Sequence, residues 1–271
     1  MKSIAYSLVA MFAIAAAAPA NAASILAPHR AVYDIALQDA SDRSGIKGVV
    51  GRMVYEFNGS PCEGYTVNFR FVTQIDTDEA SRLTDQQTTT YEDGNGDMFS
   101  FATKSYVDSR LDEEVRGTAT IEAGKTTVEL TKPTENEIEL QKTMFPTRHM
   151  VDLLERASSG ETFYETTIFD GSDGADEVLT TTVIVGKQKS AAENDPETSA
   201  IGALRNVSFW PVSIAYFDQP TERGEELPIY RIAFKLYPNG VTRSIVMDYG
   251  DFSMTGKLVD LDLFETSGDC N

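Results

Sequence analysis

Apolar and polar residues alternate along most of this chain, and this alternation limits the folds that it can adopt. In the run 230–236, Tyr, Ile, Phe and Leu are separated by Arg, Ala and Lys, and the runs 65–71 and 259–263 repeat the pattern. A period of two places successive side chains on opposite faces of a β-strand, one toward a core and one toward water. We count about 14 such runs, separated by turn residues.

These runs predict an all-β fold of about 14 antiparallel strands in one curled sheet or open barrel around an apolar interior. We expect Phe69, Phe234 and Leu236 on the apolar side and Arg70 and Lys235 toward water. A membrane-spanning barrel is the alternative, but the irregular, charged stretches between strands and the non-aromatic chain end disfavour it.

Turn residues and one helical segment interrupt the strands. Asn239-Gly240 favours a tight hairpin, and 123–125 and 171–174 resemble two further hairpin tips. The segment 146–157 predicts a helix, with Pro146 at its first position, Gly160 after its end, and Val151, Leu154 and Ala157 as its apolar stripe. We interpret 189–202 as a surface loop within a single domain, 23–271, although a domain linker would have a similar composition.

The first 22 residues have the pattern of a secretory signal peptide. Lys2 precedes an uncharged apolar run, and Ala20-Asn21-Ala22 is an A-x-A cleavage site. We expect cleavage between Ala22 and Ala23 and a periplasmic mature protein. An N-terminal membrane anchor is the alternative, but the apolar run is shorter than the ~20 residues that span a bilayer.

The chain has two cysteines, Cys62 and Cys270. Export would place them in an oxidising compartment, where an even number favours a disulfide bond. Two unpaired buried thiols remain the alternative, and the absence of a C-x-x-C motif argues against a redox-active pair.

Charge and motifs exclude several function classes. Lys and Arg number 23 against 42 Asp and Glu, a net charge of −19, which disfavours nucleic-acid binding. The sequence shows no G-x-S-x-G, P-loop or H-E-x-x-H motif. Of the two histidines, His149 is interpreted as a packing or helix-surface residue. We therefore expect no enzyme activity, no catalytic residue, no metal and no cofactor.

Two acidic segments resemble calcium-binding loops only in part. Asp93-Gly94-Asn95-Gly96-Asp97 is followed by Met98 where such a loop has glycine, and by Lys104 where it has glutamate. The segment 170–176 has the same weakness. We interpret 93–97 as a hairpin turn.

Several longer segments together resemble the EipB-like family of cell-envelope integrity proteins. They are YEFNGSPCEGYTVNFRF at 55–71, FPTRHMVDLL at 145–154, FDGSDGADEV at 169–178, WPVSIAYFD at 210–218 and YRIAFKLYPNGVTRSIVMDYGDFSMTGKL at 230–258. The resemblance implies a periplasmic spiral of about 14 strands around a helix, with Cys62 joined to Cys270. It also implies a role in envelope integrity under stress, in association with a periplasmic tetratricopeptide-repeat protein. It carries over no catalytic residue.

Two functions follow from these observations. The first is a non-enzymatic periplasmic factor that supports envelope integrity and stress resistance as a scaffold or adaptor. The second is a periplasmic carrier that holds a lipid or the acyl chain of a lipoprotein inside the curled sheet. We expect a monomer that does not span the membrane and does not bind nucleic acid.

Overall fold

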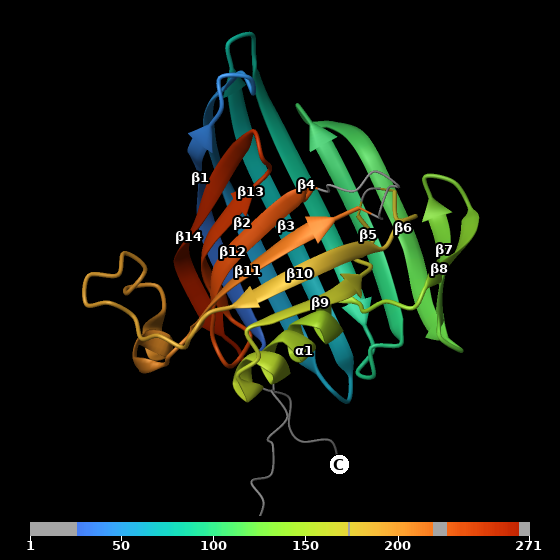
Figure 1. The fold of residues 1–271 in the computed structure, drawn as a ribbon. Helices are drawn as coiled ribbons and strands as arrows, with labels where there is room; N and C mark the ends of the chain where they lie inside the picture. Colours follow the sequence, from blue (N-terminus) through green and yellow to red (C-terminus); the bar gives the residue numbers. More distant parts are fainter. Residues whose placement is uncertain (1–25, 173, 219–226, 266–271) are drawn as a thin grey trace, which may run out of the picture.

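A computed structural model of the chain describes residues 26–172, 174–218 and 227–265 (Figure 1). These residues form fourteen β-strands, one α-helix and one short 3₁₀ helix. In chain order the elements are β1 (His29–Ala40), β2 (Ile46–Ser60), β3 (Gly64–Thr77), β4 (Ser81–Glu92), β5 (Met98–Val107), β6 (Arg110–Glu122), β7 (Lys125–Lys132), β8 (Asn136–Gln141), α1 (Pro146–Ser159), β9 (Phe163–Ile168), β10 (Leu179–Val185), η1 (Gly202–Asn206), β11 (Trp210–Phe217), β12 (Tyr230–Leu236), β13 (Thr242–Asp248) and β14 (Phe252–Leu263).

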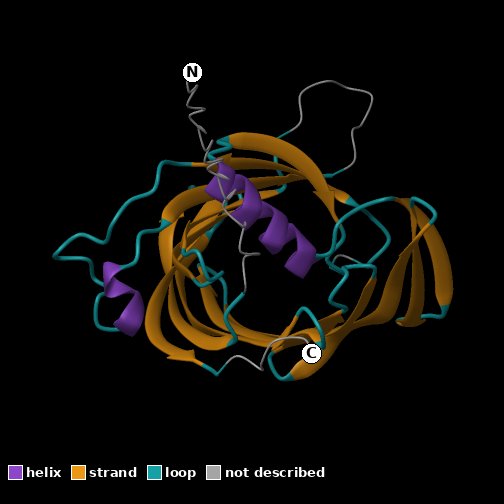
Figure 2. Ribbon diagram, turned by 90° about the horizontal axis from the view of Figure 1, so that it is seen from below, coloured by secondary structure: helices purple, strands orange, loops and turns teal. Residues whose placement is uncertain are grey.

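All fourteen strands belong to one antiparallel sheet. Their order is β8-β7-β6-β5-β4-β3-β2-β1-β14-β13-β12-β11-β10-β9, so the sheet consists of two meanders joined where β1 pairs with β14. The sheet curls into an open barrel, and β6 to β8 continue beyond it (Figure 2). The predicted fold of about 14 antiparallel strands with one α-helix is confirmed.

Aromatic side chains connect the C-terminal meander to β5 across the opening of the barrel. Its two edge strands, β8 and β9, do not pair with each other. Phe145 and Phe169 flank α1 and β9, and their rings lie 5.2 Å and 5.7 Å from the rings of Phe99 and Phe101 on β5. Gly171 lies so close to the Phe101 ring that an added Cβ would be 2.7 Å from it. This apolar cluster of phenylalanine rings therefore holds the C-terminal meander against β5 without a hydrogen-bonded ladder.

Helix α1 lies across one end of the barrel (Figure 2). Pro146 occupies its first turn, and Gly160 ends it in the left-handed conformation, with φ of +86°. Leu153, Leu154 and Ala157 are buried. The predicted helix is confirmed and extends to Ser159, but Leu153 rather than half-buried Val151 forms the apolar stripe, because the helix packs against the sheet along that line.

The predicted side-chain directions are confirmed for four of the five residues named from the sequence. Phe234 and Leu236 are buried, Phe69 faces the interior, and Arg70 is exposed and pairs with Asp85. Lys235 faces away from the interior but is only partly exposed, since it contacts Asp195 of the loop between β10 and β11.

The alternation in 259–263 is interrupted, which the sequence does not reveal. The register shifts between Val32 and Tyr33, which pair with Asp260 and Leu258. This bulge leaves Val259 without a partner, and both Val259 and Leu263 are exposed. The expectation that both residues face the core is therefore wrong.

The predicted turns lie between paired strands. The segment 123–125 joins β6 to β7, 239–240 joins β12 to β13, and 171–174 lies within the longer connection from β9 to β10. Asp93 closes the 93–97 hairpin by accepting the backbone N–H groups of Asp97 and Met98. The predicted signal peptide and Cys270 lie outside the described residues, so cleavage and disulfide pairing stay predictions.

Candidate functional site

A cavity of about 310 Å³ lies inside the barrel, next to α1. Most of its lining side chains are apolar or aromatic, and they come from both meanders and from the helix. The lining residues are Leu26, His29, Tyr33, Met53, Tyr55, Phe57, Val67, Phe69, Pro146, Thr147, His149, Met150, Ile168, Ile214, Tyr216, Ile232, Phe234, Asn239, Gly240, Thr242 and Ile245. The inward-facing side chains of the alternating strands thus create an apolar space that the sheet and α1 border.

The few polar groups of the cavity are uncharged or held neutral. The Tyr33 hydroxyl donates to the carbonyl oxygen of Thr242 at 2.7 Å. His29 Nδ1 lies 2.7 Å from the carbonyl oxygen of Ala27. Burial lowers the pKa of His29, and it lowers the pKa of His149 to about 4. His149 Nε2 is buried without a hydrogen-bond partner. At neutral pH the cavity therefore presents two neutral imidazoles and no full charge.

Glu92 connects the strands to the helix that closes the cavity. Its carboxylate accepts the backbone N–H groups of Thr147 and Arg148, both at 2.7 Å. Phe145 at the N-cap position provides no side-chain hydrogen bond, so Glu92 supplies the cap from the end of β4. Burial raises the pKa of Glu92 to about 7, although the two backbone hydrogen bonds act in the opposite direction.

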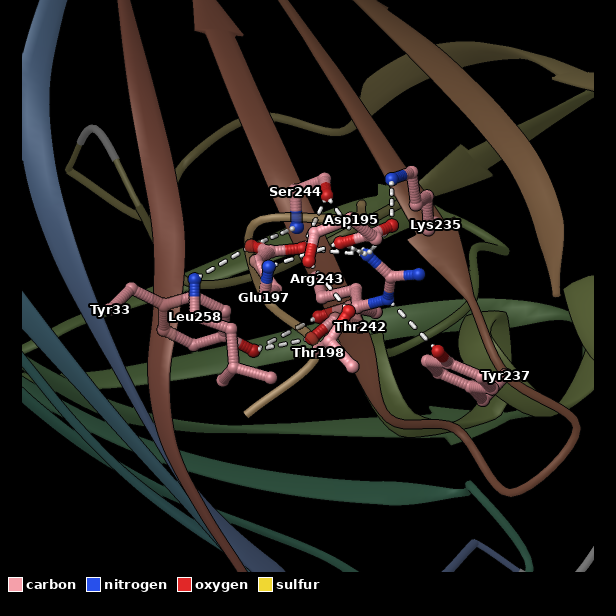
Figure 3. A network of polar contacts seen from close by, with 10 residues as sticks. All are labelled: Tyr33, Asp195, Glu197, Thr198, Lys235, Tyr237, Thr242, Arg243, Ser244 and Leu258. Atoms are coloured by element: carbon pink, nitrogen blue, oxygen red, sulfur yellow. Dashed lines mark hydrogen bonds and ion pairs between the residues drawn. The ribbon is translucent and has the colours of Figure 1, made fainter. Parts of the chain in front are cut away.

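A second polar feature lies on the outside of the barrel wall, beneath the loop between β10 and β11. Arg243 on β13 is fully buried. It donates from Nη1 to Asp195 at 2.9 Å and to Glu197 at 2.8 Å, and from Nε to the Tyr237 hydroxyl at 2.9 Å (Figure 3). Lys235 adds a second cation, 3.1 Å from Asp195. Two cations and two carboxylates thus balance in charge beneath the loop.

Glu197 fills the place where β13 and β14 separate. Beyond the pair Ile245–Gly256 the two strands no longer pair, and Ser244 has a φ of +50°. The Glu197 carboxylate accepts the backbone N–H groups of Ser244 and Leu258, at 3.0 Å and 2.7 Å, and the Ser244 hydroxyl (Figure 3). The network therefore replaces missing ladder hydrogen bonds and fixes the loop to the wall, which is a structural role.

The structure places the sequence-predicted residues as follows. Cys62 lies in the turn between β2 and β3. His149 is a buried helix residue, as the packing interpretation predicted, and it lines the cavity. The cap by Glu92 and the network around Arg243 were missed. A strand arginine between Thr242 and Ser244 offers one weak signal for the network, while Glu92 offers none, because its partners are backbone groups 55 residues away.

Two features are absent from the part of the chain that the structure describes. No three His, Cys, Asp or Glu side chains there are grouped so that they could hold a metal ion. None of the helices described there has the length and apolar character needed to cross a membrane.

The fold and the cavity define a class: antiparallel β-spiral proteins with an apolar interior. Comparison with known proteins then identifies the family of the chain. The model of the EipB-like family matches residues 20–265, and the chain belongs to this family.

Two relatives support this assignment. Cell envelope integrity protein EipB of Brucella abortus (strain 2308) is 56% identical over 253 residues, which cover 93% of this chain and 89% of that protein. The crystal structure of a beta-barrel-like protein of a domain of unknown function, from Brucella abortus, has a TM-score of 0.84 at 56% identity. The structural match covers 89% of this chain and 99% of the Brucella chain.

Proposed function

We propose that this protein is a non-enzymatic periplasmic factor that supports cell-envelope integrity by holding the apolar chain of a lipid or lipoprotein. The predicted signal peptide supports the location, and the name of the Brucella relative supports the role in the envelope. The molecular activity rests on a single observation, the apolar cavity inside the barrel.

The size and lining of the cavity fit an apolar chain. Ligand pockets span roughly 300–1,000 Å³, and an apolar cavity of about 150 Å³ already binds benzene. The cavity here, about 310 Å³, lies at the lower end of the ligand range. It suits one slender chain rather than a bulky two-chain lipid.

The chemistry of the lining supports binding rather than catalysis. Acid–base catalysis most often uses a histidine, and nucleophilic catalysis adds a serine, cysteine or lysine that the base activates. His29 and His149 line the cavity, but the lining includes no serine, cysteine, lysine or carboxylate side chain beside them.

Native mass spectrometry of the protein purified from its own periplasm tests the proposal. We expect an added lipid mass that denaturation releases. Ile214→Trp, which fills the cavity, should abolish this mass. Ile184→Trp makes the same change one strand away at an exposed position, 56% exposed, and should retain it. A wild type without lipid, or an unchanged lipid mass in Ile214→Trp, would overturn the proposal.

An adaptor for a protein partner, such as a tetratricopeptide-repeat protein, is the second candidate. The observation that favours it is the edge strand β8, which pairs within the sheet only with β7 and has mostly exposed residues. A co-purified protein mass together with an empty cavity would support this candidate in place of the carrier.

A further inference from the structure

A second hollow lies inside the barrel, at the end away from α1. It has a volume of about 300 Å³ and lies between β3 to β5 on one side and the start of β14 on the other. Its lining includes Phe71, Gln86, Ser105, Tyr249 and Phe252. In Figure 1 α1 lies at the bottom and the turn between β13 and β14 lies toward the top, so the two hollows occupy opposite ends of the interior.

Aromatic side chains connect the two hollows. Tyr216 lines the cavity next to α1, and its ring stacks on Tyr230 at 4.2 Å. Tyr230 in turn lies 6.0 Å from Tyr249, which lies 5.0 Å from Phe252 in the second hollow. On the facing wall the rings of Phe69 and Phe71 are 6.1 Å apart, and one lines each hollow. An apolar chain in the first cavity could therefore extend along aromatic surface into the second hollow.

The second hollow differs from the first in its hydrogen-bonding groups. Gln86 pairs with Phe71 on one side and with Ser105 on the other, so an amide and a hydroxyl lie side by side across neighbouring strands. Neither side chain makes a hydrogen bond to another described residue, whereas Thr73 and Thr84 nearby bind each other at 2.6 Å. The free amide and hydroxyl are available to a ligand.

Charge and ring stacking narrow the class of ligand. Asp85 also borders the hollow, but its carboxylate is engaged by Arg70 at 3.0 Å and 2.8 Å. An ionised head group would lose hydration there without gaining a counter-ion. The rings of Tyr230, Tyr249 and Phe252 are nearly parallel to one another, whereas a cage for a quaternary ammonium group needs ring faces turned toward one central point.

We propose that the hollow away from α1 binds the uncharged, hydroxyl-bearing head group of a single-chain amphiphile whose tail lies in the cavity next to α1. Glycosides and monoacylglycerols share this head-group chemistry. The inference rests on the proposed function, because the tail occupies the same apolar cavity. Tyr249, 41% exposed, lies at the open side of the hollow, where the head group would meet water.

Titration calorimetry with octyl glucoside below its micelle concentration, octanoate and octylphosphocholine tests this inference, since the three probes share a tail length. At pH 7.5 we expect octyl glucoside to bind at least about tenfold more tightly than either charged probe. Equal affinities, or a preference for either charged probe, would overturn the head-group assignment while leaving the carrier function intact. Failure of all three to bind, together with no lipid mass from the periplasm, would overturn the carrier function itself.

Two substitutions test whether the head group contacts Gln86 on the inner face of β4. Gln86→Ala removes the free amide and should weaken octyl glucoside binding about fivefold without changing octanoate binding. Gln87→Ala is the matched control, because Gln87 is exposed and contacts Asp85 instead. Equal effects of both variants, or no effect of Gln86→Ala in a protein with an unchanged circular dichroism spectrum, would contradict the proposed contact.

Discussion

The carboxylate of Glu92 accepts the backbone N–H of Thr147 at 2.7 Å and so caps α1 from a strand that ends 55 residues earlier. The position of the helix across the cavity therefore depends on β4 as well as on the helix's own sequence. A helix N-terminus attracts a negative group, and here that group is buried, with 2% of Glu92 exposed.

Glu92→Ala should lower the free energy of unfolding by about 2 kcal/mol, because it leaves the buried N–H of Thr147 and the partly buried N–H of Arg148 without an acceptor. Urea denaturation measures this loss. Glu129→Ala, an exposed change in β7, is the control and should alter stability by less than about 0.5 kcal/mol. Equal effects of the two substitutions would show that the cap does not stabilise the fold.

The pKa shifts of Glu92 and His149 predict opposing contributions to the pH dependence of stability. The pKa of Glu92 rises from 4.5 to about 7 on folding. Between these pH values the folded state therefore binds more protons than the unfolded state, and the contribution of Glu92 to stability falls as pH rises. The pKa of His149 falls from 6.5 to about 4, so its contribution is present above pH 6.5 and is lost as pH falls toward 4.

Substitution should separate these two contributions. Relative to the wild type, Glu92→Gln should become less stable toward acid, since only the loss due to His149 remains. His149→Phe should become more stable toward acid across the same window. Chemical denaturation at pH 4.5, 5.5, 6.5 and 7.5 measures both, and parallel pH profiles of the two variants would contradict the assignment.

The sequence predicts the fold well because strand alternation and turn chemistry are local. The run 230–236 and the Asn239-Gly240 turn lie where the pattern places them. The pattern fails at Val259, where a bulge shifts the register, because nothing local distinguishes a bulged residue from a paired one.

The candidate site is less predictable because it depends on long-range contacts. The cavity exists only once β1 to β3 and β11 to β13 curl toward each other and α1 crosses their end. The buried ion pairs join Arg243 to Asp195 and Glu197 across more than 40 residues. Of the parts that line the cavity, only the apolar faces of the strands and the helix beginning at Pro146 could be predicted from the sequence.

Arg243→Leu should lower the free energy of unfolding by about 3–5 kcal/mol, because it leaves Asp195 and Glu197 buried with a single remaining cation, Lys235. Arg70→Leu is the control, since the pair that Arg70 forms with Asp85 lies at the surface and should contribute less than about 1 kcal/mol. A loss for Arg243→Leu as small as that for Arg70→Leu would contradict the structural role of the network.

Phe234 and Phe99 should respond differently to truncation. Phe99→Ala opens a void in the closely packed cluster with Phe101, Phe145 and Phe169, and should cost about 3–5 kcal/mol. Phe234 lines a cavity that is already present, so one side of its ring faces that space instead of packed side chains. Phe234→Ala should therefore cost clearly less in urea denaturation, and a larger cost at Phe234 would mean that its side chain is packed on all sides.

The last prediction concerns the two cysteines. Leu263, near the end of the described chain, pairs with His29 on β1, and His29 pairs with Phe57 on β2, the strand that leads to the turn holding Cys62. The described end of β14 thus approaches the same end of the sheet as Cys62. A disulfide bond to Cys270 would tie down the chain end and stabilise the fold by at most roughly 5 kcal/mol for so long a loop.

We expect Cys62→Ser and Cys270→Ser to lower the melting temperature equally, and the double variant to be no less stable than either, because each removes the same bond. Reductant should bring the wild type to the level of the variants and leave the variants unchanged. If the denatured, unreduced wild type reacts with two equivalents of a thiol reagent, the bond is absent and the prediction is wrong.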